Sequence, residues 1–156
     1  MRKKNKVIVW LFGLGILGTA LWNISRHSTQ SQVYCSGRIQ LDPQLITKAS
    51  SIRTLFLVLH DAASSSPMPY GAQKITLTEA PSEHVTNFIL TQDNVQVMQP
   101  NMPAPKKLTL KARLDLDGTG GKDKPGDLTG YLRSIPLGSH NLVLTIDSLI
   151  ASDQKG

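Results

Sequence analysis

Residues 107–117 read KLTLKARLDLD, and this stretch decides the fold class because it alternates between two kinds of side chain. Leucine or alanine occupies every second position, and charged residues or threonine occupy the positions between them. Strict alternation of this kind is typical of a β-strand with one buried and one solvent-facing side. The pattern predicts that the core side of this strand consists of Leu108, Leu110, Ala112, Leu114 and Leu116.

The flanking sequence has the same character. Six further segments are predicted strands, at residues 37–41, 52–60, 70–78, 85–91, 127–137 and 140–150. Segment 52–60 is apolar on both faces, which favours a central strand, and Asp42-Pro43 is typical of a short helical turn. Residues 25–156 contain no amphipathic helix of useful length. The predicted class is therefore all-β, an antiparallel β-sandwich of about seven strands.

A different kind of sequence precedes these strands. Arg2, Lys3, Lys4 and Lys6 are followed by Val7–Trp22, which contains no charged residue. Basic residues stay on the cytoplasmic side of a membrane, and hydrocarbon accepts only backbone whose hydrogen bonds close internally, as in a helix. We therefore expect an N-terminal transmembrane helix that places the remaining chain outside the cytoplasm.

The apolar run is at the short end for a membrane-spanning helix, so a signal peptide is the alternative. Gly18-Thr19-Ala20 resembles a cleavage site, with cleavage after Ala20. Leu21 and Trp22 continue the apolar run past that site, which favours an uncleaved anchor. The expected organisation is a basic head and anchor (1–24), a polar stalk (25–36), a β-sandwich (37–151) and a tail (152–156).

The charge distribution excludes one class of partner. The net charge is +6, but four of the 17 basic residues precede the apolar run. The remaining 13 basic residues are nearly balanced by 11 acidic residues. With no basic stripe interleaved with aromatic residues, nucleic-acid binding is not expected. The sole cysteine, Cys35, lacks an internal disulfide partner, and we interpret it as a small buried residue.

Two loops combine proline with methionine. Pro67-Met68-Pro69 lies in the loop 63–69, and Met98 and Pro100 lie in the connection 92–105. Methionine adapts to irregular apolar surfaces, and proline limits the entropy lost on binding. We therefore predict a partner-binding patch formed by Pro67, Met68, Pro69, Met98 and Pro100. The alternative is that the methionines plug the ends of the sandwich.

An acidic, glycine-rich turn raises the question of a metal. Asp115, Asp117 and Asp123 surround three glycines, as carboxylates do in calcium loops. The turn lacks a bidentate ligand at its end, and Lys122 and Lys124 add positive charge, so an ordinary turn is the favoured interpretation. The chain offers no Gly-x-Ser-x-Gly elbow and no convergent titratable groups, so it is not expected to be an enzyme.

The order of several short motifs resembles a known family. Gly37-Arg-Ile-Gln-Leu-Asp-Pro43 opens the domain, Phe88-x-Leu90 follows, and Pro125-Gly-Asp-Leu-x-Gly130 comes near its end. Together they are similar to the C-terminal periplasmic domain of the cytochrome c biogenesis protein CcmI (CycH). The resemblance covers residues 37–150. The family's two membrane segments and helical TPR repeats are replaced here by one apolar segment and a short stalk.

The resemblance implies a function in c-type cytochrome maturation. It suggests a non-enzymatic protein without a cofactor, anchored in the inner membrane by one helix, with a cytoplasmic N-terminus and a periplasmic domain. Expected partners are apocytochrome c, the haem-ligation complex or a separate TPR protein. The alternative is a generic cell-envelope protein, whose β-sandwich is structural or stabilised by calcium.

Overall fold

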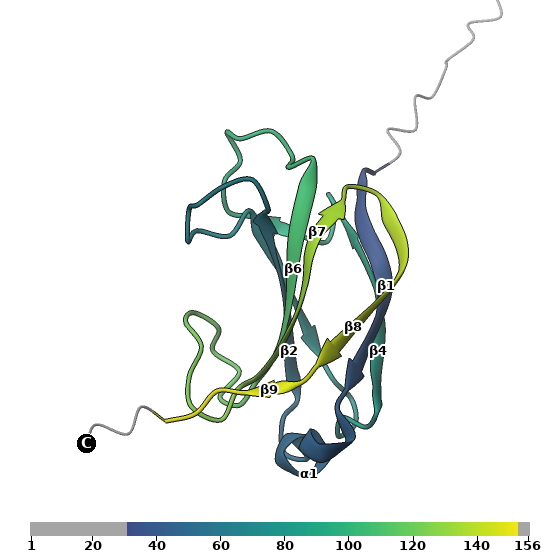
Figure 1. The fold of residues 1–156 in the computed structure, drawn as a ribbon, viewed down its shortest axis with the longest axis vertical. Coiled ribbons are helices and arrows are strands. Elements are labelled where there is room, and N and C mark those ends of the chain that lie inside the picture. The colour runs from purple at the N-terminus through teal and green to yellow at the C-terminus, as the bar shows by residue number, and fades with distance from the viewer. Residues whose placement is uncertain (1–30, 153–156) are drawn as a thin grey trace, which may run out of the picture.

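The computed structural model describes residues 31–152, which form two β-sheets packed face to face (Figure 1). The smaller sheet has the order β4-β1-β8, and the larger sheet has the order β5-β3-β2-β6-β7-β9. The strands are β1 (Val33–Leu41), β2 (Thr54–Asp61), β3 (Gly71–Thr76), β4 (His84–Thr91), β5 (Gln96–Val97), β6 (Lys107–Asp115), β7 (Leu128–Pro136), β8 (Ser139–Ile146) and β9 (Ser148–Leu149).

The predicted β-sandwich class is confirmed, with two corrections. The described residues form nine strands instead of about seven, because β5 and β9 are two-residue strands that a sequence pattern does not reveal. The sandwich is also not wholly antiparallel, since β1 pairs with β8 in parallel. A short 3-10 turn (Pro43–Leu45) and α1 (Ile46–Ala49) follow Asp42, whose side chain accepts a hydrogen bond from the backbone N of Gln44 at 2.8 Å.

The core lies between the sheets. Leu55, Leu57 and Leu59 of β2 are fully buried, as are Leu108, Leu110 and Leu114 of β6. They pack in one cluster with the inward-facing residues of the smaller sheet, which include Ile39, Leu41, Leu144 and Ile146. The alternation in residues 107–117 therefore predicted the buried face correctly along most of the strand.

The prediction is wrong at the end of β6. The strand stops at Asp115, so Leu116 lies in the following turn and is 51% exposed. Arg113 and Asp115, expected on the solvent side, are only 3% and 2% exposed. The cause is residues 116–127, which fold back over the outer face of the larger sheet and which we call the covering loop (Figure 1, lower left).

The N-terminal boundary of the domain also differs from the expectation. β1 begins at Val33, and Tyr34 and Cys35 are buried, so the last four residues of the predicted stalk belong to the domain. The Cys35 side chain has no exposure, and burial raises the pKa of its thiol to about 12, which agrees with an inert core residue. The predicted anchor at 1–24 lies outside the described residues. None of the helices within residues 31–152 has the length and hydrophobicity that crossing a bilayer requires.

A groove on the outer face as the candidate functional site

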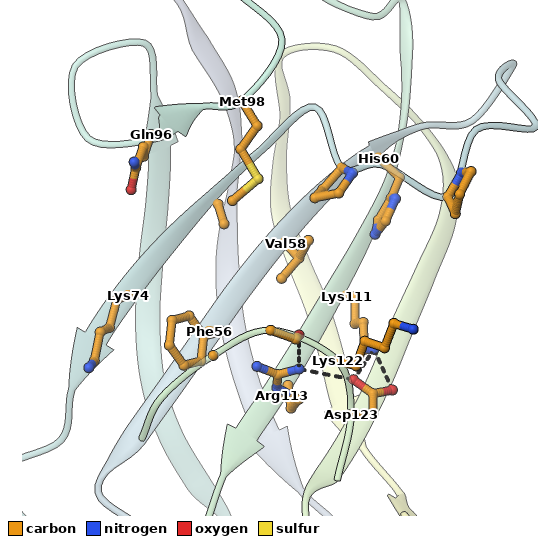
Figure 2. Close-up of a pocket in the computed structure, with 15 residues that line it drawn as sticks. Phe56, Val58, His60, Lys74, Gln96, Met98, Lys111, Arg113, Lys122 and Asp123 are labelled. Carbon is orange, nitrogen blue, oxygen red and sulfur yellow. Dashed lines mark hydrogen bonds and ion pairs between the residues drawn. The ribbon is translucent and has the colours of Figure 1, made fainter. Parts of the chain in front are cut away.

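A groove of about 600 Å³ lies on the outer face of the larger sheet, and we call it the outer groove (Figure 2). Its floor is formed by the outward-facing side chains of the central strand β2, namely Phe56, Val58 and His60, together with Ala72 of β3. The inward-facing residues of β2 are leucines in the core. The apolar character of both faces of β2, visible in the sequence, thus provides both the core and the groove floor.

Loops 63–69 and 92–105 form one end of the outer groove (Figure 1, upper left). Strand β5 pairs with the start of β3, and the backbone N of Met98 donates to the carbonyl oxygen of Tyr70 at 2.8 Å. Gln99 Nε2 donates to the carbonyl oxygens of Met68 and Pro69, at 3.1 and 3.0 Å. These contacts hold together two loops that lie about thirty residues apart in the sequence.

The covering loop forms the opposite end. The carboxylate of Asp123 accepts hydrogen bonds from Lys111 Nζ at 2.5 and 2.6 Å and from Arg113 Nη1 at 3.1 Å (Figure 2). Arg113 Nη1 also donates to the carbonyl oxygen of Gly121 at 2.8 Å, and Lys74 Nζ donates to that of Gly118 at 2.8 Å. Cations on β3 and β6 therefore hold the covering loop against the sheet.

Arg113 is the centre of this network and is almost completely buried. Its Nη2 donates to Asp115 at 2.7 Å, and its Nε lies 3.8 Å from Asp127 Oδ2 and has no hydrogen-bond partner among residues 31–152. Asp127 in turn accepts from the backbone N of Leu116 at 3.0 Å and of Lys124 at 2.9 Å. The two ends of the covering loop are thus tied to one buried carboxylate.

Comparison with known proteins identifies the family. The model of the cytochrome c-type biogenesis protein H Ig-like domain matches residues 35–147. The chain belongs to this family. The resemblance drawn from the sequence motifs is therefore confirmed, and family membership supports involvement in cytochrome c maturation. No curated protein and no solved structure gives a significant match.

The structure of this CycH Ig-like domain brings together three of the five residues predicted to bind a partner. Pro67, Pro69 and Met98 line the outer groove. Met68 does not line it, although its loop is bonded to that of Met98, and its side chain is 57% exposed. Pro100 is exposed on the same connection as Met98 and also lies outside the lining. Their binding role stays a prediction.

The three aspartates of the calcium alternative are separated by protein cations in this CycH domain. Asp115 pairs with Arg113, Asp123 pairs with Lys111 and Arg113, and Asp117 pairs with Lys124. Hydrogen bonds from Lys124 and Thr119 hold the pKa of Asp117 well below its usual range. Within residues 31–152 no three His, Cys, Asp or Glu side chains converge on a metal position. The arrangement is that of a turn closed by ion pairs.

Sequence reasoning missed the floor and the cationic lining of the outer groove. The sequence pattern predicts residues 52–60 only as a central strand, and it places Lys111 only on the solvent-facing side of residues 107–117. The available signal was that β2 has apolar Phe56 and Val58 at outward positions. Its neighbours β3 and β6 carry Lys74, Lys111 and Arg113 on the same face. The register of β2 with its two neighbours places Lys74 and Arg113 opposite Phe56.

Removing the Asp123 carboxylate should loosen the covering loop in a pH-dependent way. Burial alone would raise the pKa of Asp123, but hydrogen bonds and charges from Lys111 and Arg113 outweigh it and lower the pKa. Because the pKa is lower in the folded state, the carboxylate stabilises the fold at pH values above its pKa in the unfolded chain. This stabilisation is lost as the pH falls through the pKa of the folded state. We expect Asp123→Asn to lower the free energy of unfolding by about 1 kcal/mol at neutral pH.

The difference in free energy of unfolding between the parent and Asp123→Asn should shrink as the pH falls below about 4, where the carboxylate of the unfolded chain begins to protonate. Urea denaturation of both proteins across the acid range measures it. Asp93→Asn is the matched control, because Asp93 is exposed and no cation pairs with its carboxylate in the described chain. A difference between Asp123→Asn and the parent that is the same at neutral and acid pH would contradict the assignment.

Proposed function

We propose that this protein is a membrane-anchored periplasmic accessory protein that binds apocytochrome c and assists its delivery to haem ligation. Family membership supports a role in cytochrome c maturation. The basic head and apolar run at residues 2–22 support the anchor and the orientation. The observation that carries the binding function is the outer groove, where two proline- and methionine-bearing loops meet above an apolar floor.

The groove suits protein recognition more than catalysis. Its lining combines aromatic, aliphatic and methionine side chains with a few charged groups, as binding sites generally do. Its one histidine, His60, has a pKa lowered by burial and by the charge of Lys111, so the ring is neutral at physiological pH. An unfolded apocytochrome exposes apolar segments that a folded cytochrome buries. Recognition of such segments would distinguish the apoprotein from the finished product.

Two measurements test the proposal. Purified full-length protein in mild detergent should bind fluorescently labelled, haem-free apocytochrome c and should not bind the folded holocytochrome. Deleting the gene in its host should lower the covalently haem-stained c-type cytochromes and leave b-type cytochromes unchanged. Co-purification from native membranes would then show whether the haem-ligation complex or a TPR protein is a further partner. Equal binding to apo- and holocytochrome, with normal haem staining in the deletion strain, would contradict the function.

Replacing Met68 and Met98 together by serine should weaken apocytochrome binding about thirtyfold. Each side chain is about half exposed and can bury apolar area against a partner, which is worth roughly 1 kcal/mol or more per methionine. The melting temperature should stay close to that of the parent, because neither methionine is part of the core cluster. Fluorescence anisotropy and thermal denaturation of the same samples measure both quantities.

Met102→Ser is the control for that experiment. Met102 is about as exposed as Met98 and lies in the same connection, but unlike Met98 it does not line the outer groove. Its replacement should therefore change neither binding nor stability. A fall in melting temperature for the Met68/Met98 double variant, without a change in affinity, would assign the two methionines to packing of the sandwich end.

A further inference from the structure

The backbone of the groove floor is not available for pairing with a partner strand. Strand β2 pairs with β3 along one side and with β6 along the other, over almost its whole length. A partner therefore cannot add a strand there, as happens at open sheet edges. Whatever occupies the outer groove is held mainly by side chains, and these side chains determine its chemistry.

Positive charge dominates the lining of the groove. Lys74, Lys111, Arg113 and Lys122 are cationic, and Asp123 is the one carboxylate among the lining residues. That carboxylate is already bonded to Lys111 and Arg113. The Arg113 guanidinium is further balanced from beneath by the buried Asp115 and Asp127. Two cations and three carboxylates therefore meet at the inner part of the groove, which has no excess of positive charge.

Two cations at the groove remain uncompensated. Within residues 31–152 neither Lys74 nor Lys122 makes an ion pair, although Lys74 Nζ donates to the carbonyl oxygen of Gly118. Both lysines are exposed. Since the neutral His60 ring adds no charge, these two lysines supply the exposed, unpaired positive charge of the lining. An anionic occupant would be attracted to this position.

The uncompensated charge lies directly beside apolar surface. Lys74 Nζ is 5.6 Å from the centroid of the Phe56 ring, and Phe56 continues into Val58 along the floor (Figure 2). An occupant that satisfies both features must carry a carboxylate close to an apolar side chain. The volume of about 600 Å³ suits a few side chains rather than a folded surface.

We propose that the outer groove binds a short segment of the partner protein in which an apolar or aromatic side chain is flanked by aspartate or glutamate. The segment's apolar side chain lies on Phe56 and Val58, and its carboxylates pair with Lys74 and Lys122. This rests on the proposed function in one respect, namely that the protein acts by binding a protein partner.

The test uses full-length protein in mild detergent and three labelled peptides of equal length. The first peptide has a phenylalanine-leucine centre flanked by glutamates, the second has the same centre flanked by lysines, and the third has a serine centre flanked by glutamates. We expect measurable binding of the first peptide, and binding at least about tenfold weaker for the other two. Binding of the first peptide should also weaken as salt is added, because salt screens exposed charges.

Reversing the two lysines together, Lys74→Glu with Lys122→Glu, should abolish the preference for the acidic peptide and improve binding of the lysine-flanked one. Lys48→Glu with Arg38→Glu is the matched control, since it changes the net charge equally at exposed positions outside the groove. The control should bind like the parent. Equal binding of the acidic and basic peptides, or an equal effect of the two double variants, would overturn the proposal.

Apocytochrome binding measured on the same variants separates this inference from the proposed function. If apocytochrome binds the parent and the Lys74/Lys122 variant equally, and the acidic peptide does not bind, the function stands and the groove assignment is wrong. If the acidic peptide binds with the expected lysine dependence and apocytochrome does not bind, the groove assignment stands and apocytochrome is not the partner.

Discussion

Replacing Arg113 by methionine should lower the free energy of unfolding by about 3–5 kcal/mol. The side chain is 3% exposed and is surrounded by three carboxylates, of Asp115, Asp123 and Asp127. Two of them, on Asp115 and Asp127, are themselves almost completely buried. Without the guanidinium they would be left as uncompensated charges in a poorly solvated site, and this desolvation cost makes the substitution severe.

Arg133→Met is the control for this prediction. Arg133 is an exposed residue of β7 that lies over the Tyr131 ring, with its guanidinium carbon 5.1 Å from the ring centroid, and it pairs with no carboxylate within residues 31–152. Its replacement should cost well under about 1 kcal/mol. Adding Asp115→Asn to Arg113→Met should recover part of the loss, because it removes one of the stranded charges. Urea denaturation followed by circular dichroism measures all three variants. A loss no larger than that of Arg133→Met would contradict the central role of Arg113.

The same substitution should also affect the outer groove. Arg113 holds the covering loop through Asp123 and the carbonyl oxygen of Gly121. Any Arg113→Met protein that remains folded should therefore show greater hydrogen exchange at the amides of residues 118–124, and the amides of β2 should stay protected.

Replacing Gly130 by alanine should have the second large effect, a loss of about 3 kcal/mol. Gly130 lies on β7 of the larger sheet where that strand meets β8 of the smaller one. A Cβ at this position would lie 2.0 Å from the carbonyl oxygen of Thr145 and 2.9 Å from the Cα of Ile146. Both are main-chain atoms, which cannot rotate away as a side chain could. The two sheets would have to separate locally.

Gly138→Ala distinguishes this steric effect from the ordinary cost of losing a glycine. Gly138 has a φ of +82°, which alanine adopts with strain, but the space that its Cβ would occupy is open, with no atom of the described chain within 4 Å. The expected loss there is about 1 kcal/mol. Denaturation midpoints of the two variants, at unchanged slope, give the comparison. A Gly130→Ala protein as stable as Gly138→Ala would show that β7 and β8 are less closely packed than the structure indicates.

Several features of the fold were predictable because they depend on neighbours in the sequence. The alternation in residues 107–117 requires only that side chains one residue apart point to opposite faces of a strand. The Asp42 cap requires only that a carboxylate reach a backbone amide two residues later. The buried leucines of β2 and β6 follow from the same local rules.

The outer groove depends on partners that lie far apart in the sequence. The backbone of Met98, next to β5, hydrogen-bonds to that of Tyr70. Lys74 hydrogen-bonds to Gly118, and Lys111 to Asp123. Short patterns do not encode such pairings, and a two-residue strand such as β5 has no detectable period. For the same reason the burial of Arg113 and Asp115 could not be foreseen, since their alternation in β6 is that of a solvent-facing side.

By itself, the sequence determined the β class, the side of each long strand that faces the core and the family to which the domain belongs. Only the tertiary structure decided that a loop covers one end of the outer sheet face and that two proline- and methionine-bearing loops enclose the other. The physical reason is that periodicity records which side chains avoid water. It does not indicate which segments, distant in the sequence, pack over the outer face of the larger sheet.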